Sequence, residues 1–393
     1  MRLTNRLAVV AVAVTAVVGG MALVVPDANA APQASTGRAV RACSAAPAAG
    51  MAACDAWVRT DLKQAAVAPA ATPAGYGPAD LRSAYKLTSS GSASQTIAIV
   101  DAFNDPNAES DLAVYRSQFG LPACTTANGC FRKVNQNGAT SPLPSNNTGW
   151  AEEISLDVDM VSAICPGCHI LLVEASSNSF ANLGASVNRA ATMGANAISN
   201  SYGGSDTADS SAPFYNHPGI AVTASSGDSG FGAQFPASSH FVTAVGGTHL
   251  TRSSTTRGWT ETVWSGAGSG CSSFNAALTG AAGFNTGCAN RAEADVSAVA
   301  DPNTGVAVYD TFREPGWLVF GGTSVASPII AAVYGLAGNE ASIDNNFPYA
   351  HSGSFFDVTS GSNGSCSPSQ LCTARAGWDG PTGLGTPNGT GGF

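Results

Sequence analysis

Two carboxylates four residues apart are the first feature of this chain that could do acid–base chemistry. The pattern after Asn147 predicts a helix over 150–164, and on a helix Glu153 and Asp157 are neighbours on one face. Like charges at this spacing destabilise a helix by roughly 0.2–0.5 kcal/mol. Two carboxyls in one place can share a proton, which suits acid–base catalysis. The alternative is a solvated acidic face near a helix N-terminus, where the helix dipole favours negative charge.

A serine at the start of an apolar helix could act as a nucleophile. Ser324 follows Gly322 and Thr323 and leads into the apolar run 329–336. A helix N-terminus has free backbone N–H groups, and these stabilise negative charge that develops on a reacting oxygen. The alternative is an ordinary Ser/Thr cap after a glycine-rich turn.

An α/β framework is predicted to position these residues. From about Gly75, apolar runs bounded by turn residues alternate with helical patterns. Strands without alternation of polar and apolar residues are buried on both faces, so we expect a doubly wound, mostly parallel sheet covered by helices on both faces. The predicted strands are 96–100, 170–173, 197–201, 220–224 and 241–245, and the predicted helices are 110–119, 150–164 and 180–193.

The composition excludes several classes of function. Charged residues make up 11% of the 393 residues and hydrophobic residues 44%, a balance that excludes a chain disordered by high charge. The formal net charge of -9 argues against a nucleic-acid partner and against an anionic membrane surface.

The N-terminus has the pattern of an export signal. Arg2 and Arg6 precede the apolar run 7–25, and Ala28, Asn29 and Ala30 supply a small-residue cleavage site. We expect residues 1–30 to be a signal peptide, with an uncleaved membrane anchor as the alternative. Residues 31–74, rich in Ala and Pro, are predicted to be a short leader or linker, and residues 75–393 a single domain.

Ten cysteines in an exported chain indicate disulfides. The simplest pairing joins close neighbours in the sequence, although spacing alone leaves the connectivity open. The string Cys165-Pro-Gly-Cys168-His169 also has the pattern that attaches c-type haem. The expected pairs are Cys43–Cys54, Cys124–Cys130, Cys165–Cys168, Cys271–Cys288 and Cys366–Cys372.

These motifs together resemble a known family. Gly322, Thr323 and Ser324, with Pro328 four residues on, resemble the nucleophile motif of subtilisin-like and sedolisin-like serine peptidases. The sedolisins are more similar, because Glu153-Ile-Ser-Leu-Asp157 resembles their Glu/Asp helix and the His-Gly-Thr-His string of subtilisins is absent. Asp101 occupies the place of a subtilisin aspartate but has no such histidine partner.

The resemblance extends from about Gly75 to the C-terminus and implies a subtilisin-like fold with a serine-carboxyl site. It implies that Ser324 is the nucleophile, Glu153 the base and Asp157 the residue that orients Glu153. The turn Ser226-Gly227-Asp228 resembles the sedolisin turn whose aspartate serves the oxyanion hole, a role that passes to Asp228.

The resemblance also implies one structural Ca²⁺. Asp357-Val358-Thr359 and Gly377-Trp378-Asp379 are similar to the C-terminal calcium site of the family, in which two aspartates and backbone carbonyls bind the ion. Arg375 stands where a glycine is expected. The implied ligands are the side chains of Asp357 and Asp379 and the carbonyls of Val358, Arg375 and Gly377.

A second departure from the family concerns the N-terminus. Sedolisins usually carry a folded prodomain of well over a hundred residues, whereas only 44 residues separate Ala30 from Gly75 here. The leader contains Cys43 and Cys54 and could pack on the catalytic domain.

The sequence therefore predicts a secreted, extracellular serine-carboxyl endopeptidase that cleaves proteins or peptides at acidic pH. We expect a monomer that has no membrane contact after signal cleavage. Three alternatives remain. They are a sedolisin scaffold that only binds, an α/β-hydrolase esterase using Ser324, Asp344 and His351, and a subtilisin-like mechanism using one of His169, His217, His240 and His249.

Overall fold

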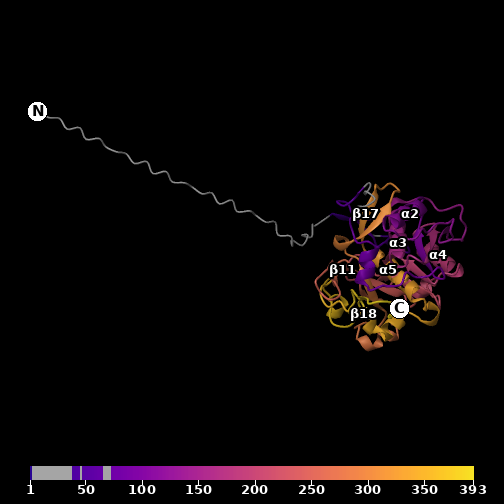
Figure 1. Ribbon diagram of the computed structural model, residues 1–393. Helices are drawn as coiled ribbons and strands as arrows, with labels where there is room; N and C mark the ends of the chain where they lie inside the picture. Colours follow the sequence, from indigo (N-terminus) through magenta and orange to yellow (C-terminus); the bar gives the residue numbers. More distant parts are fainter. Residues whose placement is uncertain (2–37, 45–46, 65–71) are drawn as a thin grey trace. The chain divides into compact units, whose positions relative to one another are not determined.

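The computed structural model describes Met1 and residues 38–44, 47–64 and 72–393 (Figure 1). The chain divides into two units, Met1–Ser35 and Thr36–Phe393, and the account below concerns the second. The predicted signal peptide 1–30 lies outside the described residues apart from Met1. Among the described residues, no helix is long and apolar enough to cross a membrane.

A central sheet of eight strands forms the framework of the domain. The strand order is β12-β11-β9-β7-β4-β6-β5, with β15 also paired to β11, and every pair is parallel except β11 with β12. The bounds are β4 Thr96–Ala102, β5 Phe131–Asn135, β6 His169–Ala175, β7 Ala197–Asn200, β9 Ala221–Ser225, β11 Thr243–Arg252, β12 Trp259–Val263 and β15 Val296–Val299.

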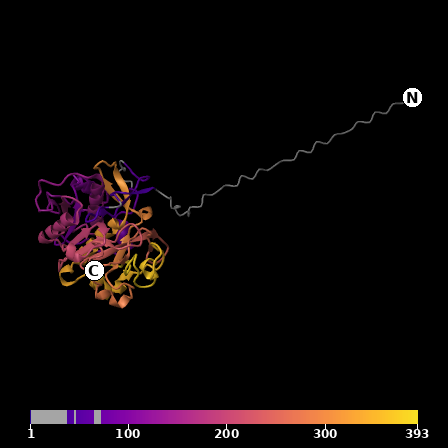
Figure 2. The same cartoon turned by 180° about the vertical axis from the view of Figure 1, so that it is seen from behind.

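Helices cover this sheet. Consecutive residues of β4 from Ile97 to Ala102 are all buried, and because consecutive side chains point to opposite faces, both faces of the strand are covered. Helices α3 and α5 pack against each other and against the sheet, and α4 packs on β4 and β6; Figure 2 gives the reverse view. The bounds are α1 Pro78–Ala84, α2 Ala108–Gln118, α3 Thr148–Ile164, α4 Phe180–Thr192, α5 Thr323–Ala337 and α6 Phe347–Ala350.

The predicted α/β architecture is confirmed, with differences at the ends of elements. Helix α3 begins at Thr148, two residues before the predicted start, because the Asn147 side chain accepts a hydrogen bond from the Trp150 N–H. Helix α5 begins at Thr323, so Ser324 lies in its first turn.

The N-terminal segment contributes strands to two smaller sheets. Strand β2 (Ala53–Cys54) pairs with β8 (Tyr202–Ser205), which also pairs with β10 (Gln234–Phe235). We call residues 52–59, which include β2 and β3, the strap. The other sheet has the order β1-β3-β17-β16, with β1 Ala39–Arg41, β3 Trp57–Arg59, β16 Val306–Asp310 and β17 Gly316–Gly321.

The short strands near the C-terminus form two further pairs. Strand β13 pairs with β14, and β18 pairs with β19, all in antiparallel fashion. Their bounds are β13 Gly270–Cys271, β14 Ala292–Glu293, β18 Phe355–Phe356 and β19 Thr386–Pro387.

All five predicted disulfides are present. The pairs are those between close neighbours in the sequence, and no free cysteine remains among the described residues. Cys165 and Cys168 are bonded to each other, so their sulfur atoms are not available for haem attachment.

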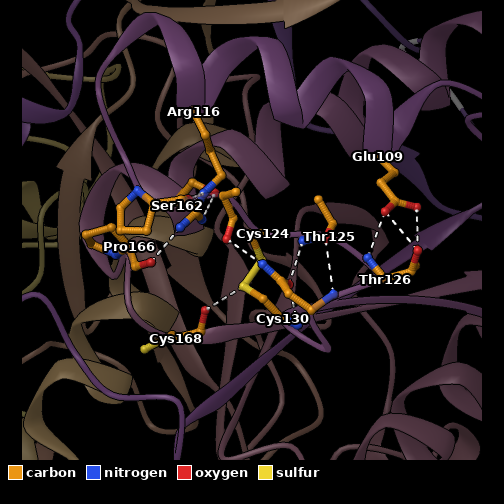
Figure 3. The surroundings of a disulfide bond; sticks show 12 residues. Glu109, Arg116, Cys124, Thr125, Thr126, Cys130, Ser162, Pro166 and Cys168 are labelled. Atoms are coloured by element: carbon orange, nitrogen blue, oxygen red, sulfur yellow. Dashed lines mark hydrogen bonds between the residues drawn. A yellow bond between two sulfur atoms is a disulfide. The ribbon is translucent and has the colours of Figure 1, made fainter.

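A buried arginine holds α2, α3 and the turn before β6 together (Figure 3). The Arg116 guanidinium donates to the carbonyls of Pro122 and Pro166, each at 2.5 Å, and to the Ser162 hydroxyl at 2.9 Å. The side chain is 1% exposed, and burial lowers its pKa to about 10. Because Ser162 lies near the end of α3, these bonds help to fix the helix that carries Glu153.

We predict that Arg116→Met lowers the free energy of unfolding by about 2–4 kcal/mol, because the buried Pro166 carbonyl and Ser162 hydroxyl lose their donor. Urea denaturation followed by circular dichroism measures the change. Arg132→Met is the matched control, since Arg132 is exposed and should tolerate the substitution. Equal losses in the two variants would contradict the role of Arg116.

Candidate active site

The candidate catalytic residues gather at the carboxyl edge of the parallel sheet. Asp101 lies near the end of β4, Ser201 directly follows β7, and Asp228 lies three residues after β9. The second turn of α3 brings Glu153 to the same edge, and the first turn of α5 brings Ser324 there. Ligand sites of open α/β sheets occur at this edge, where strands end and loops begin.

The Glu153 carboxyl is fully buried beside other carboxyls. Burial, followed by the charges of Asp157 and Asp101, raises the pKa of Glu153 well above its usual value, and the nearby Ser324 hydroxyl lowers it. Neither oxygen has a well-formed hydrogen bond within the described part of the chain. Burial thus favours the protonated form of Glu153, and the Asp157 carboxyl and Ser324 hydroxyl lie next to it.

Asp157 is held by a hydroxyl and by Glu153. Ser201 Oγ donates to Asp157 at 2.9 Å, equally near to both carboxyl oxygens. Burial and the charge of Asp101 raise the pKa of Asp157 well above its usual value, whereas the hydrogen bond from Ser201 and the nearby Glu153 carboxyl lower it. The predicted pair therefore meets as a coupled unit, with Asp101 as a third carboxyl beside it.

The third carboxyl, Asp101, has no cationic partner. Burial and then the charge of Glu174 raise the pKa of Asp101 well above its usual value. Both of its oxygens are buried without a hydrogen-bond partner among the described residues. Sequence reasoning placed Asp101 at the end of a strand but gave it no role.

Ser324 follows Gly322, whose positive φ is a backbone conformation that other residues rarely adopt. Gly322 has φ 101°, and a Cβ there would lie 2.1 Å from the Asp55 carbonyl oxygen and 2.6 Å from Asp228 Oδ2. The backbone N–H of Ser324 donates to the Asp55 carbonyl at 3.0 Å, and Ser324 Oγ donates to the Ser201 carbonyl at 3.0 Å. A peptide carbonyl of the chain itself therefore sits at the nucleophile.

Asp228 faces the same carbonyl region. Its Oδ1 accepts from the Thr323 N–H at 2.7 Å and from Thr323 Oγ1 at 2.8 Å, while Oδ2 is buried without a partner among the described residues. Burial and then the charge of Asp55 raise the pKa of Asp228 well above its usual value. A protonated Asp228 could donate from the free oxygen to an oxyanion.

The strap passes through this site as an extended chain. Ala53 pairs with Gly203 on one side of Asp55, and Trp57 pairs with Gly321 on the other. The Asp55 N–H donates to the Ser201 carbonyl at 3.3 Å. Asp55 thus binds the active-site backbone through both its N–H and its C=O.

Sequence reasoning missed Asp55 and Ser201. Asp55 lies in an Ala-rich segment without a motif, and its place depends on pairing with β8 and β17, which lie far away along the chain. Ser201 offered a weak signal, since a polar residue after a buried parallel strand lies at the carboxyl edge.

The histidine alternatives find no support in the geometry. All five histidines belong to the described residues, and none is hydrogen-bonded to Ser324. His351 is exposed, stacks on Phe347 and bonds to the Phe347 carbonyl. No hydrogen bond among the described residues joins Ser324, Asp344 and His351, so the alternative esterase triad is not formed.

The predicted calcium ligands lie in one surface loop region. Asp379 is buried and Asp357 exposed, and burial raises the pKa of Asp379 to about 7, with a contribution from the charge of Asp357. Asp357 Oδ2 accepts from the Gly377 N–H at 2.9 Å. Among the described residues, the carbonyls of Val358, Arg375 and Gly377 accept no hydrogen bond. Two carboxyls and free carbonyls are a donor set that suits Ca²⁺.

Arg375 departs from the expected glycine without blocking this region. Its guanidinium turns away and donates to the Trp378 carbonyl at 3.0 Å and to the Phe284 and Asn285 carbonyls at 3.4 Å. The backbone carbonyl of Arg375 stays available.

A cavity of about 760 Å³ lies elsewhere, at the amino ends of β9 and β11. Ala221, Val222 and Thr243 line it, so it is at the edge opposite to Ser324. The carboxyl edge is filled by the strap.

The chain is similar in sequence to known peptidases. Kumamolisin of Bacillus sp. (strain MN-32) is 29% identical over 360 residues, which cover 81% of this chain and 63% of kumamolisin. Tripeptidyl-peptidase sed1 of Aspergillus fumigatus is 39% identical over 106 residues, 25% of this chain and 15% of that protein. The chain thus spans less than two thirds of either relative. No family model matches it.

Solved structures show the same likeness. Pseudomonas sedolisin, described as a serine-carboxyl proteinase complexed with two molecules of pseudo-iodotyrostatin, aligns with a TM-score of 0.66 and 25% identity, covering 81% of this chain and 96% of that one. A psychrophilic protease, S41, aligns with a TM-score of 0.50 and 17% identity over 80% of this chain and 97% of its own, a likeness of fold alone.

The parallel sheet with Ser324 at the start of α5 defines a protein of the subtilisin-like fold. The buried Glu153 and Asp157 lie beside Ser324, and none of the five histidines, all within the described residues, is hydrogen-bonded to it. The chain is similar in sequence and in fold to peptidases of the sedolisin family.

Buried carboxyls predict that the protein is most stable in acid. Burial raises the pKa of Glu174 and Asp310 to about 8 and that of Asp105 to about 6, from ordinary values near 4. The folded state therefore binds more protons than the unfolded state, and the free energy of unfolding falls as pH rises from about 4 to 8.

Calorimetry from pH 3 to 9 should show the highest melting temperature near pH 4 and a steady decline toward pH 8. Asp310→Asn should flatten the decline, because an amide has no proton to lose, while the exposed Asp344→Asn should leave it unchanged. A melting temperature that rises between pH 4 and 8 would contradict the assignment.

Proposed function

We propose that this chain is a secreted serine-carboxyl endopeptidase that cleaves proteins or peptides in acid. Ser324 is the nucleophile, Glu153 the general base, Asp157 the residue that orients Glu153, and Asp228 the oxyanion donor. The observation that supports this most is that the Ser324 N–H binds a peptide carbonyl at the point that Asp228 Oδ2 also faces. A carbonyl held there would become the oxyanion after attack.

The proposed reaction follows from these positions. Ser324 Oγ attacks the carbonyl carbon and gives its proton to Glu153, while the Ser324 N–H and the protonated Asp228 bind the oxyanion. The C–N bond then breaks, and the amine leaves with the proton from Glu153. Water attacks the acyl-enzyme, Glu153 takes a proton from it, and the acid is released as the Ser324 hydroxyl re-forms.

An acidic pH optimum follows from the residue types. A histidine base is increasingly protonated below a pH of about 6.5, whereas carboxyl groups ordinarily have a pKa near ~4. A carboxylate base therefore still accepts a proton at an acidity at which an imidazole is already protonated. Asp228 must carry a proton in order to donate, and its burial favours that proton. The requirement for a proton on Asp228 fails toward neutral and alkaline pH, so activity should decline there.

Endopeptidase activity is favoured over release of tripeptides. Upstream of Asp55, the Ala52 N–H donates to the Asn178 carbonyl at 2.8 Å and Met51 forms a β-bridge with Ser179, so residues beyond the third before the carbonyl at Ser324 still have partners on the domain. A tripeptidyl-peptidase needs a cleft that ends after the third residue. The strap also continues into β3 on the other side.

We propose that one structural Ca²⁺ binds Asp357, Asp379 and the carbonyls of Val358, Arg375 and Gly377. The ion would neutralise two neighbouring carboxylates and join the two loops that carry them. Export fits the five disulfides, which persist in oxidising environments. We expect the mature protein to act as a monomer without nucleic-acid or membrane partners.

Substitution of the site residues should abolish peptide cleavage. We expect losses of about 10³-fold or more in kcat/KM for Ser324→Ala and Glu153→Gln and of about 10²–10³-fold for Asp228→Asn, measured on a peptide mixture from pH 3 to 8. Wild-type activity should peak well below neutrality. Glu152→Gln is the matched control, because the neighbouring Glu152 faces Glu314 and Lys63 instead of Ser324. Undiminished cleavage by Glu153→Gln, or an alkaline optimum, would falsify the carboxylate mechanism.

Removal of calcium should destabilise the domain. A chelator should lower the melting temperature by about 5 °C or more, and added Ca²⁺ should restore it, because an ion that binds only the folded state stabilises it by mass action. Asp379→Ala should show the lower value with and without the chelator, and the exposed Asp344→Ala should respond like the wild type. A chelator that leaves the wild type unchanged would show that the site is wrongly assigned.

A further inference from the structure

The Asp55 side chain enters a small polar pocket next to the nucleophile. Its Oδ2 accepts hydrogen bonds from Ser225 Oγ at 2.8 Å and from Gln234 Nε2 at 2.5 Å. Asp55 is 4% exposed, so these two donors replace water as the hydrogen-bond partners of its carboxyl. None of the roles proposed above uses this pocket.

The pocket is built into the catalytic domain. Ser225 ends β9, and Gln234 begins β10 beside β8. The Gln234 amide rests against Gly203 and Gly227, where an added Cβ would come within 2.1 Å and 2.9 Å of amide atoms. Gln234 Nε2 also donates to the Ser225 carbonyl at 3.3 Å, which orients the amide. The glycines thus leave space for a glutamine that presents its N–H groups to the pocket.

The backbone contacts identify which substrate residue fills the pocket. Because the Asp55 carbonyl accepts from the Ser324 N–H, the peptide bond at the nucleophile is that between Asp55 and Ala56. Asp55 therefore occupies the position of the residue before the cleaved bond. The strap pairs with β8 before this bond and with β17 after it, as an extended substrate would.

Given the proposed peptidase function, we propose that Ser225 and Gln234 form the specificity pocket of the enzyme. It selects a short side chain that ends in an acceptor oxygen, aspartate or asparagine, before the cleaved bond. The chain's own Asp55 occupies it as a tethered pseudosubstrate.

Hydrogen-bond chemistry accounts for this selection. Both groups donate to one oxygen, which a carboxyl and a carboxamide both supply. Leucine would fill a similar volume but leave two buried donors unpaired, and sites built to hydrogen-bond a substrate discriminate strongly against such analogues. Burial raises the pKa of Asp55 to about 6, while the bonds from Ser225 and Gln234 and the charge of Arg41 lower it, so the pocket accepts the side chain with or without its proton.

The first test compares peptides that differ only in the residue before the cleaved bond. We expect the wild type to cleave after Asp and Asn at least tenfold faster, in kcat/KM, than after Leu. Gln234→Leu should reduce this ratio at least tenfold by slowing only the Asp and Asn peptides. Gln370→Leu is the matched control, since the Gln370 amide makes a single long bond of 3.5 Å to the Asn285 carbonyl. Cleavage of all three peptides at equal rates would overturn the pocket, although the peptidase function would stand.

The second test needs no peptidase activity. In the full-length Ser324→Ala protein, amide hydrogen exchange of residues 53–59 reports how firmly the strap is held. We expect Asp55→Asn to retain the protection and both Asp55→Leu and Gln234→Leu to increase exchange at least tenfold, with Gln370→Leu unchanged. Unchanged exchange in Asp55→Leu would overturn the proposal even if no peptide is cleaved in the first test.

Discussion

The candidate site depends on the burial of several carboxyls that form no ion pair with a cation among the described residues. Glu153, Asp157 and Asp101 lie together in the interior, and burial raises the pKa of each, which favours their protonated forms. The surrounding structure serves this arrangement. The sheet brings Asp101 and Ser201 to one edge, α3 presents the other two carboxyls, and Ser201 supplies a hydroxyl to Asp157.

The second constraint is the close approach of the strap backbone at Asp55 to the backbone at the start of α5. Gly322 has no Cβ, so the Asp55 carbonyl and the Asp228 carboxyl can both reach the start of α5. Thr323 holds one oxygen of Asp228 and leaves the other free. Gly322 therefore leaves space for the Asp55 carbonyl, Thr323 orients the Asp228 carboxyl, and Ser324 is the candidate nucleophile.

Much of this could be predicted from the sequence because the signals were local. The Glu153/Asp157 spacing, the turn at Asp228 and the glycines before Ser324 are each contained in a short string, and the buried strands lack alternation. The pairing of cysteines that are close in sequence was equally local. Asp55 and Gln234 could not be predicted, because their meeting depends on β2 and β10 joining opposite edges of β8. Nothing in the Ala-rich segment around Asp55 indicates that its backbone reaches the nucleophile.

Because the strap is part of the same chain, it affects how strongly other peptides can bind at Ser324. A segment on the same chain acts as a ligand whose effective concentration is set by the connecting chain and does not fall on dilution. A free peptide must therefore compete with the strap, which is always present. The apparent affinity of the peptide falls in proportion to the fraction of molecules in which the strap has left the site. The Cys43–Cys54 bond strengthens this competition, since the ring limits the conformations that residues 53 and 54 can adopt when they leave β8.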